Sequence, residues 1–133
     1  MKLVVDASAA IAGTLGGRES SRQILDALAA ASVIVAPDLF VAEVASGLWK
    51  YVIAGQLSIG EAVERLDDAR KLVDRYEPVA DLAPEALREA SARRHSVYDL
   101  FYIVLARREG AAILTIDTRL KKLATTMGVS AGL

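Results

Sequence analysis

The sequence predicts an α/β domain in which helices cover both faces of a mostly parallel sheet. Short apolar runs rich in β-branched residues, at Leu3–Val5, Ser32–Val35 and Ala112–Ile116, are typical of strands buried on both faces. Longer segments with helical character separate these runs, and such alternation favours parallel strands joined by helices. The length of 133 residues fits one domain spanning residues 1–133.

Start and stop signals define the helices in the first half of the chain. Pro37 suits the first turn of a helix, and Gly55 supplies the end of that helix. Ser58 and Glu61 have the spacing of a capping box, in which each residue satisfies a free backbone N–H of the other. Together with the apolar periodicity, these signals predict helices over Ser20–Ala31, Asp38–Ile53 and Ser58–Val73.

The second half of the chain continues the same alternation. Gly110 is suited to end a helix, and the apolar run at Ala112–Ile116 follows it directly. Glu77–Val79 is expected to be a turn or a short strand, and Val129 is a candidate for an edge strand. The predicted helices here are Pro84–Arg94, Val97–Arg108 and Asp117–Thr126.

Composition excludes several classes of protein and of metal site. With 53% hydrophobic residues the chain carries too much apolar surface to be a disordered segment. It has no cysteine and one histidine, which excludes thiolate sites and zinc sites built from several histidines. Asp6 interrupts what would be the apolar part of a signal peptide, and no uncharged run reaches the roughly 18 residues of a membrane span. We therefore expect a cytoplasmic protein without a membrane partner.

Four acidic residues stand apart from the mixed charge clusters of the helices. An ionised carboxylate in an apolar segment is costly unless it is paired or binds a cation. Four of them on separate segments indicate a shared cation, and Mg²⁺ or Mn²⁺ is the usual choice for carboxylate ligands. Asp26 is also solitary, but Arg22 lies four residues earlier and is expected to pair with it. The four candidates are Asp6, Glu43, Asp99 and Asp117.

Each of these acids also has a structural interpretation that the sequence leaves open. Asp6 and Asp117 follow predicted strands, where either could cap the next helix. Ser96 and Asp99 have capping-box spacing. Glu43 is harder to explain in this way, because apolar residues surround it on its helix. Asp6 and Asp117 should in any case share one edge of the sheet, since both follow parallel strands.

The order and context of the four acids resemble those of PIN-domain nucleases, most closely VapC-type toxins of prokaryotic toxin–antitoxin pairs. The resemblance covers essentially the whole chain and is carried by the segments Val5–Ser8, Pro37–Val44, Val97–Leu100 and Leu114–Asp117. It implies a three-layer α/β/α sandwich and RNA hydrolysis with Mg²⁺ or Mn²⁺. It also implies that the four acids form the catalytic and metal-binding set, with Ser8 and Thr115 as supporting hydroxyls.

The resemblance further implies two protein partners. VapC-like proteins commonly form homodimers and bind a VapB-like antitoxin whose tail fills an apolar groove. The helices Leu39–Ile53 and Ile59–Val73 are candidate walls of such a groove. The chain departs from the common pattern after Ser8, where Ala12–Gly17 replaces bulky and acidic residues; we expect a mobile, substrate-side loop there, since glycine is costly to order.

Positive charge near the acids indicates how RNA could be held. The net charge of −1 is an average: without the four acids, 13 acidic residues remain against 16 basic ones. Arginine binds phosphates without reading sequence, and the candidates are Arg93, Arg94 and Arg119. Trp49, Tyr51 and Tyr102 are expected in the core or in an interface rather than against RNA bases.

Three other interpretations compete with a toxin nuclease. A receiver domain has a similar size and strand–helix pattern, but it requires an acidic pair after the first strand and a lysine where Asp117 stands. A non-catalytic PIN-fold binding module would not need four intact acids. An RNA-processing nuclease outside a toxin–antitoxin pair would carry the same residues, and a short upstream gene for a DNA-binding antitoxin would separate it from a toxin.

Overall fold

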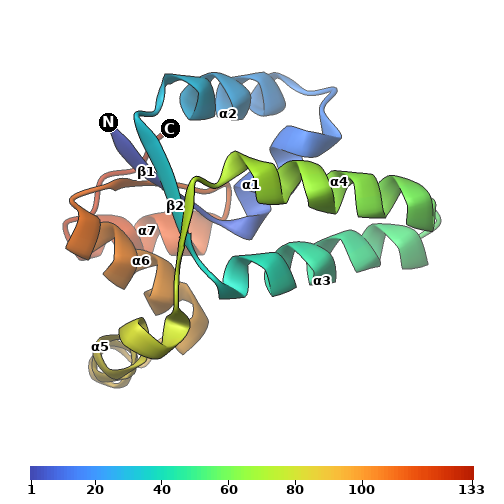
Figure 1. Cartoon of the computed structure of the whole chain (residues 1–133). Coiled ribbons are helices and arrows are strands. Elements are labelled where there is room, and N and C mark those ends of the chain that lie inside the picture. Colours follow the sequence, from blue (N-terminus) through green and yellow to red (C-terminus); the bar gives the residue numbers. More distant parts are fainter.

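The computed structural model describes residues 1–133, which form a four-stranded sheet with helices on both faces (Figure 1). All neighbouring strands pair in parallel, in the order β3-β2-β1-β4. The strands are β1 (Lys2–Val5), β2 (Val33–Pro37), β3 (Arg75–Glu77) and β4 (Ala112–Leu114). The helices are α1 (Ala7–Leu15), α2 (Glu19–Ala30), α3 (Leu39–Ile53), α4 (Ile59–Leu72), α5 (Val79–Arg93), α6 (Val97–Glu109) and α7 (Thr118–Thr126). None of these helices is both long and apolar enough to cross a membrane.

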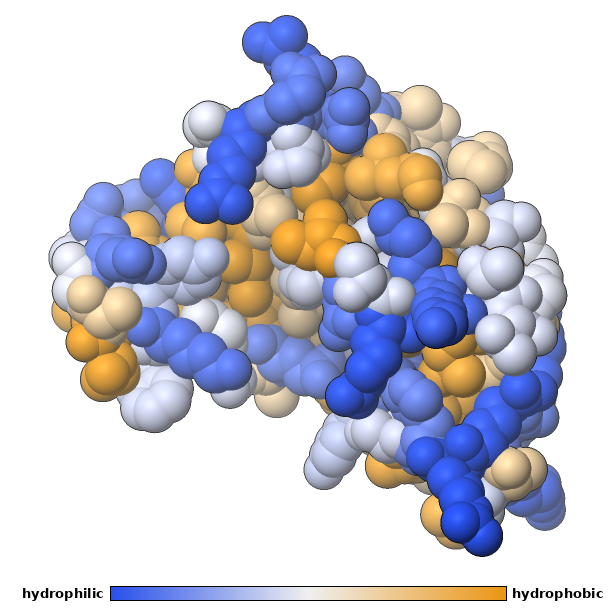
Figure 2. Space-filling model, turned by 180° about the vertical axis from the view of Figure 1, so that it is seen from behind, coloured by the Kyte–Doolittle hydropathy of each residue, from blue (hydrophilic) through white to orange (hydrophobic).

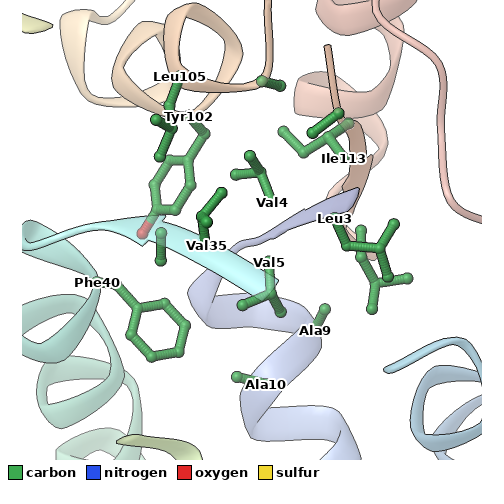
Figure 3. Close-up of a cluster of buried hydrophobic side chains, with 14 of the residues drawn as sticks. Leu3, Val4, Val5, Ala9, Ala10, Val35, Phe40, Tyr102, Leu105 and Ile113 are labelled. Carbon is green, nitrogen blue, oxygen red and sulfur yellow. The ribbon is translucent and has the colours of Figure 1, made fainter. Parts of the chain in front are cut away.

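The helices make two layers, one on each face of the sheet. α6 packs against β1, β2 and β4, and α5 packs on α6 from outside. α1 packs with α2, α3 and α4 on the opposite face. Figure 3 shows this division in the core, where Tyr102 and Leu105 of α6 lie on one side of β1 and Ala9 and Ala10 of α1 lie on the other. The expected three-layer α/β/α sandwich is confirmed.

A single cluster of 32 buried hydrophobic residues joins the two layers through the sheet. Val4, Val5 and Val35 have no exposed surface, as expected for strands covered on both faces. Burial of apolar surface on both sides stabilises the sheet by roughly 25 cal/mol per Å² removed from water. The carboxyl ends of the strands are therefore held on a rigid support, which fixes the residues that follow them.

The segment after Asp6 is a helix, which corrects the expectation of a mobile loop over Ala12–Gly17. α1 runs to Leu15, and only Gly16 and Gly17 lie outside it among those residues. Alanine-rich sequence has the highest helix propensity, and the Asp6 side chain caps the first turn. The two glycines have positive φ angles of 69° and 83°, which turn the chain into α2.

Two other boundaries differ from the sequence-based expectations. α5 begins at Val79 rather than Pro84, so Pro84 lies inside the helix, and it lacks the N–H that would bind the exposed Ala80 carbonyl. β4 ends at Leu114, two residues early. The candidate edge strand at Val129 is a single bridge between Ala131 and Ile113.

Candidate active site

The sheet brings the ends of β1 and β4 together. Val5 is in register with Leu114, and the Asp6 amide donates to the Leu114 carbonyl at 3.1 Å. Asp6 and the Thr115–Asp117 segment therefore leave the sheet side by side at its carboxyl edge, as expected for a parallel sheet. This adjacency accounts for the early end of β4, because Thr115 turns its side chain toward Asp6.

Asp6 is the most tightly held of the four acids. It is only 5% exposed. The Ala9 amide and the Ser8 hydroxyl donate to Oδ1 at 2.9 and 2.8 Å, and the Thr115 hydroxyl donates to Oδ2 at 2.5 Å. The Ala9 contact caps α1, so the structural interpretation of Asp6 holds beside the functional one. Ser8 and Thr115, which were expected as supporting hydroxyls, thus both contact Asp6.

Glu43 projects from the second turn of α3 and is fixed by a residue of α6. The Tyr102 hydroxyl donates to Glu43 Oε1 at 2.5 Å, while Oε2 accepts no hydrogen bond. Tyr102 itself is 3% exposed, with its ring in the core and its hydroxyl at the edge of the cluster (Figure 3). Tyr102 was expected in the core or in an interface, and this contact with Glu43 was not predicted. The available signal was its position three residues after Asp99, on the same helical face.

Asp99 is not a helix cap. Ser96 occupies the N-cap position of α6 without a side-chain capping bond, so the Ser96–Asp99 capping box does not form. Asp99 Oδ2 is buried and has no hydrogen-bond partner. The nearest charged groups are His95 Nδ1 at 3.7 Å and Arg119 Nη2 at 3.6 Å from this oxygen. Asp99 Oδ2 is thus a buried hydrogen-bond acceptor without a donor.

Asp117 caps α7 and is the most exposed of the four. Its Oδ1 accepts from the Arg119 and Leu120 amides at 2.9 and 3.2 Å, as expected for an N-cap. Its Oδ2 accepts no hydrogen bond. The Asp117 amide in turn donates to Thr115 Oγ1 at 3.0 Å, so the end of β4 and the start of α7 are tied to the Asp6 side chain.

The electrostatics of the site disfavour four negative charges. Burial raises the pKa of Asp6, Glu43 and Asp99 above the ordinary range. Hydrogen bonds to Asp6 and Glu43, and His95 near Asp99, oppose this effect without reversing it. Repulsion adds to it, from Asp117 on Asp6 and Asp99 and from Asp6 and Asp99 on Glu43. A bound cation would remove both penalties.

The donor set fits a hard divalent cation. Glu43 and Asp117 each use one oxygen for anchoring and leave the other free, and Asp99 presents a buried oxygen without a partner. Oxygen ligands of this kind suit Mg²⁺ or Mn²⁺. No three acids or histidines converge closely enough to make a complete coordination shell by themselves. Binding therefore requires side-chain rotation or water ligands, both of which are usual for Mg²⁺.

All four acids line one cavity of about 380 Å³. Its walls come from α1, α3, α6 and α7, and besides the acids they include Ser46 and Lys50 of α3. Figure 2 shows the molecule from behind, with the α3–α4 arm projecting to the left, α5 at lower right and the surface hollowed between them. A cavity of this size, open to solvent at the sheet edge, can admit part of a polymeric substrate.

The predicted substrate-binding arginines lie in different surroundings. Arg119 reaches the site, with Nη2 at 3.6 Å from Asp99 Oδ2 and a side chain 71% exposed. Arg93 pairs with Glu89 at 2.9 Å, and Arg94 ends α5 in a left-handed conformation; neither lines the acidic cavity.

The other solitary acid, Asp26, serves as a comparison for the four at the site. It is exposed on α2, and the expected ion pair with Arg22 does not form. An acidic residue with no other charge near it in the sequence is therefore not necessarily buried. The four acids of the cavity differ from Asp26 in that separate elements bring them to one place.

This architecture defines an α/β protein in which the carboxyl edge of a parallel sheet gathers four acids from separate elements in one cavity. The model of the PIN domain family matches residues 3–125, so the chain belongs to the PIN domain family. Nucleases of this family that carry the VapC name generally depend on a divalent metal.

The chain is similar to several proteins named as VapC ribonucleases. It is 35% identical over 122 residues to "Ribonuclease VapC3" of Pyrobaculum aerophilum, covering 90% of this chain and 92% of that one. It is 34% identical over 119 residues to "Ribonuclease VapC1" of Mycobacterium tuberculosis, covering 88% and 86%. The crystal structure of PAE2754 from P. aerophilum covers 99% of this chain and 92% of its own, with a TM-score of 0.70 and 26% identity. The resemblance to VapC-type PIN-domain ribonucleases is confirmed.

Proposed function

We propose that this protein is a divalent-metal-dependent endoribonuclease and the toxin of a VapBC-type toxin–antitoxin pair. The observation that carries the catalytic part is the convergence of Asp6, Glu43, Asp99 and Asp117 on one cavity at the carboxyl edge of the sheet. The VapC ribonucleases named above are similar to this chain over most of its length. This similarity supports both the proposed ribonuclease activity and the proposed toxin role. RNA is the substrate, and the cytoplasm is the expected place of action.

The acids would hold Mg²⁺ or Mn²⁺ through their free oxygens, with Asp6 and Asp99 closest to the ion. Such an ion, when bound, activates a water molecule and neutralises charge on the phosphate. The chain's own part is positioning. Ser8, Thr115 and the α1 backbone hold Asp6 in one orientation. Pre-organised carboxylates spare the reorganisation that a flexible site would need at the moment of reaction.

Arg119 adds an exposed positive charge beside the acids. Its guanidinium lies next to Asp99 and is mostly exposed, so it has room to turn outward. A phosphate entering the cavity offers this arginine a bidentate partner. We propose that Arg119 contacts substrate, and that Arg93 and Arg94 lie on the outer path of the RNA.

The experiment that tests the proposal is RNA cleavage in the presence of Mg²⁺ or Mn²⁺. We expect Asp6→Asn and Asp99→Asn to lower the rate on the order of 100-fold, because each removes a charge that would bind the ion. Asp26→Asn is the matched control, since Asp26 is an exposed solitary acid on α2. Circular dichroism establishes that each variant is folded.

Equal cleavage by wild type and both site variants would reject these acids as the active site. Cleavage that persists after exhaustive chelation would reject the metal dependence. Absence of cleavage of any RNA by the folded wild-type protein, with either metal, would favour the alternative of a non-catalytic PIN-fold binding module.

The antitoxin partner is supported by an apolar groove away from the acids. Eight hydrophobic residues of α3 and α4 line this groove of about 160 Å³, among them Leu48 and Val63. Trp49 and Ile59 at its rim are 59% and 70% exposed, which is costly in water. We propose that a VapB-like antitoxin covers this groove. A short upstream antitoxin gene, and co-purification that Trp49→Glu abolishes, would support it; a VapC-type nuclease without such a neighbour would instead be an RNA-processing enzyme.

A homodimer is the remaining part of the proposal. Light scattering on the purified chain should give twice the monomer mass of 14.2 kDa. A mass that stays at one chain over the accessible concentration range would reject the dimer.

A further inference from the structure

A second cavity adjoins the acidic one and has the opposite charge. It measures about 440 Å³ and lies between α1, the start of α2 and α3. The two cavities have Ser8, Ile11, Gly47 and Lys50 in common, so they lie side by side. No acidic residue lines the second cavity, whereas Arg18 and Lys50 both do.

The two basic side chains of this cavity form no ion pair within the protein. Neither Arg18 nor Lys50 takes part in a salt bridge or a side-chain hydrogen bond, and both are exposed. Three arginines of α5 and α6 are instead paired with glutamates of α5: Arg93, Arg107 and Arg108. Unpaired cations beside a cluster of acids are available to an anionic ligand.

Helix geometry sets Lys50 at a defined place relative to the acids. Glu43, Gly47 and Lys50 lie on one face of α3, at helical spacings of four and three residues. Seven residues of α-helix advance about 10 Å. Lys50 therefore stands beyond the acids, at the junction of the two cavities, where it can reach a phosphate next to one held at the acids.

Gly47 lines both cavities and lets α1 pack closely on α3 between them. A Cβ atom on Gly47 would lie 2.4 Å from Cδ1 of Ile11, so the glycine permits the close approach of α1 and α3. Tyr51 follows Lys50 and lines the second cavity, half-buried and with no hydrogen bond to its hydroxyl. The cavity thus combines two cations with an aromatic ring and apolar side chains, the groups that bind single-stranded nucleic acid.

We propose that the second cavity binds the nucleotide that flanks the scissile bond, with Lys50 and Arg18 on RNA phosphates and Tyr51 against a base. This inference rests on the proposed ribonuclease function. It assigns the nucleotide next to the scissile bond to the α1–α3 side of the acids, whereas Arg93 and Arg94 would contact RNA farther from that bond. Single-stranded RNA is the ligand, because a base must leave its helix to reach Tyr51.

The test is binding of a short fluorescein-labelled single-stranded RNA in EDTA, where no cleavage occurs, followed by fluorescence anisotropy. We expect Lys50→Ala and Arg18→Ala each to weaken binding about three- to tenfold, and Lys50→Glu more than tenfold. Each alanine variant should also lower the slope of log affinity against log salt by about 0.7. Arg88→Ala is the control, because Arg88 is an exposed, unpaired cation on α5.

A separate pair of variants tests the contact between Tyr51 and the base. Tyr51→Phe should bind like wild type, while Tyr51→Leu should bind at least about fivefold more weakly, because only an aromatic ring stacks on a base. In metal-containing cleavage assays, Lys50→Ala should raise KM and leave kcat within about twofold, unlike the site carboxylate variants.

Three results would overturn the inference. Wild-type cleavage together with unchanged affinity and salt slope in Lys50→Ala and Arg18→Ala would reject the second cavity while leaving the nuclease intact. A folded wild-type protein that neither binds nor cleaves single-stranded RNA would reject both the cavity and the function on which it rests. Wild-type RNA binding in which only the control Arg88→Ala is weakened would place the path on α5 instead.

Discussion

Two groups of acids in this molecule show opposite behaviour. Between α5 and α6, Glu85 accepts from Arg107 and Arg108 at 2.9 and 2.8 Å. Burial opposes the ionisation of Glu85, but these guanidinium groups outweigh it and lower its pKa. At the sheet edge, burial and mutual repulsion raise the pKa values of Asp6 and Glu43. The Glu85 carboxylate is thus neutralised by arginines of the same chain, whereas Asp6 and Glu43 have no cationic partner.

This difference distinguishes carboxylates that bind an external ligand from carboxylates in ordinary ion pairs. Surface ion pairs such as those of Glu85 satisfy both partners and contribute at most about 1 kcal/mol. Carboxylates gathered in a cavity destabilise the fold unless something binds them. A protein retains such a cost at a functional site, where the missing charge is supplied from solution.

The same substitution in the two groups should give crossed results. Glu43→Gln should lower RNA cleavage on the order of 100-fold, because it removes a proposed metal ligand, without lowering stability. Glu85→Gln should leave cleavage within about twofold but lower the free energy of unfolding by at most about 1 kcal/mol. Cleavage rates and urea denaturation measure the two effects; loss of activity in Glu85→Gln would break the comparison.

Tyr102→Phe tests the contact that positions Glu43. Removing the buried hydroxyl leaves Glu43 Oε1 without its donor. We expect about a tenfold lower cleavage rate and a loss of about 1 kcal/mol in unfolding free energy. Tyr98→Phe is the control on the same helix, because Tyr98 is 61% exposed. If both tyrosine variants cleave equally well, Tyr102 has no positioning role.

Metal binding should stabilise the site region specifically. A ligand that binds only the folded state at 100 times its Kd adds about 2.7 kcal/mol, which for a domain of this size is a rise in Tm of about 5 °C or more. Mg²⁺ or Mn²⁺ should produce this shift in wild type and not in a variant carrying both Asp6→Asn and Asp99→Asn. An equal shift in the two proteins would place the ion elsewhere.

The smallest expected effect is on the pH dependence of stability in chelator. Asp6, Glu43 and Asp99 have raised pKa values in the fold and therefore hold protons more tightly when folded, so stability rises as pH falls toward their ordinary values of 3.8 to 4.5. Glu85 and Glu89 have lowered pKa values and act in the opposite sense. Their contribution is lost below the ordinary glutamate value of 4.5.

The Tm measured across this range should therefore pass through a maximum at mildly acidic pH. The Tm there should be about one to two degrees higher than at neutral pH. Glu43→Gln should flatten the rise on the neutral side and leave the acid side unchanged. A Tm that falls steadily from pH 7 downward in the wild-type protein would contradict the raised pKa values at the site.

The sequence was sufficient to predict the features that depend on local pattern. The apolar runs located β1, β2 and β4, and the spacing of Ser58 and Glu61 predicted a capping box that the structure confirms. The placement of Asp6 and Asp117 at one edge followed from parallel strand geometry alone. These features depend on periodicity and chain direction, which are legible in a single sequence.

Features that depend on packing were not accessible in this way. Helical spacing puts Tyr102 on the same face as Asp99, but it does not show that the Tyr102 hydroxyl reaches Glu43, 59 residues away in sequence, or that Arg22 does not meet Asp26. α1 was missed because its alanine-rich sequence has little hydrophobic periodicity. Lys50 was overlooked because its importance depends on the cavity that it lines, not on its neighbours in the chain.

The bond from Thr115 to Asp6 joins residues 109 positions apart. Until the chain has been synthesised past β4 and the start of α7, Asp6 lacks its buried hydroxyl donor and the cavity lacks a wall. The four acids can therefore come together only in the last part of synthesis, after β4 and the start of α7 have left the ribosome.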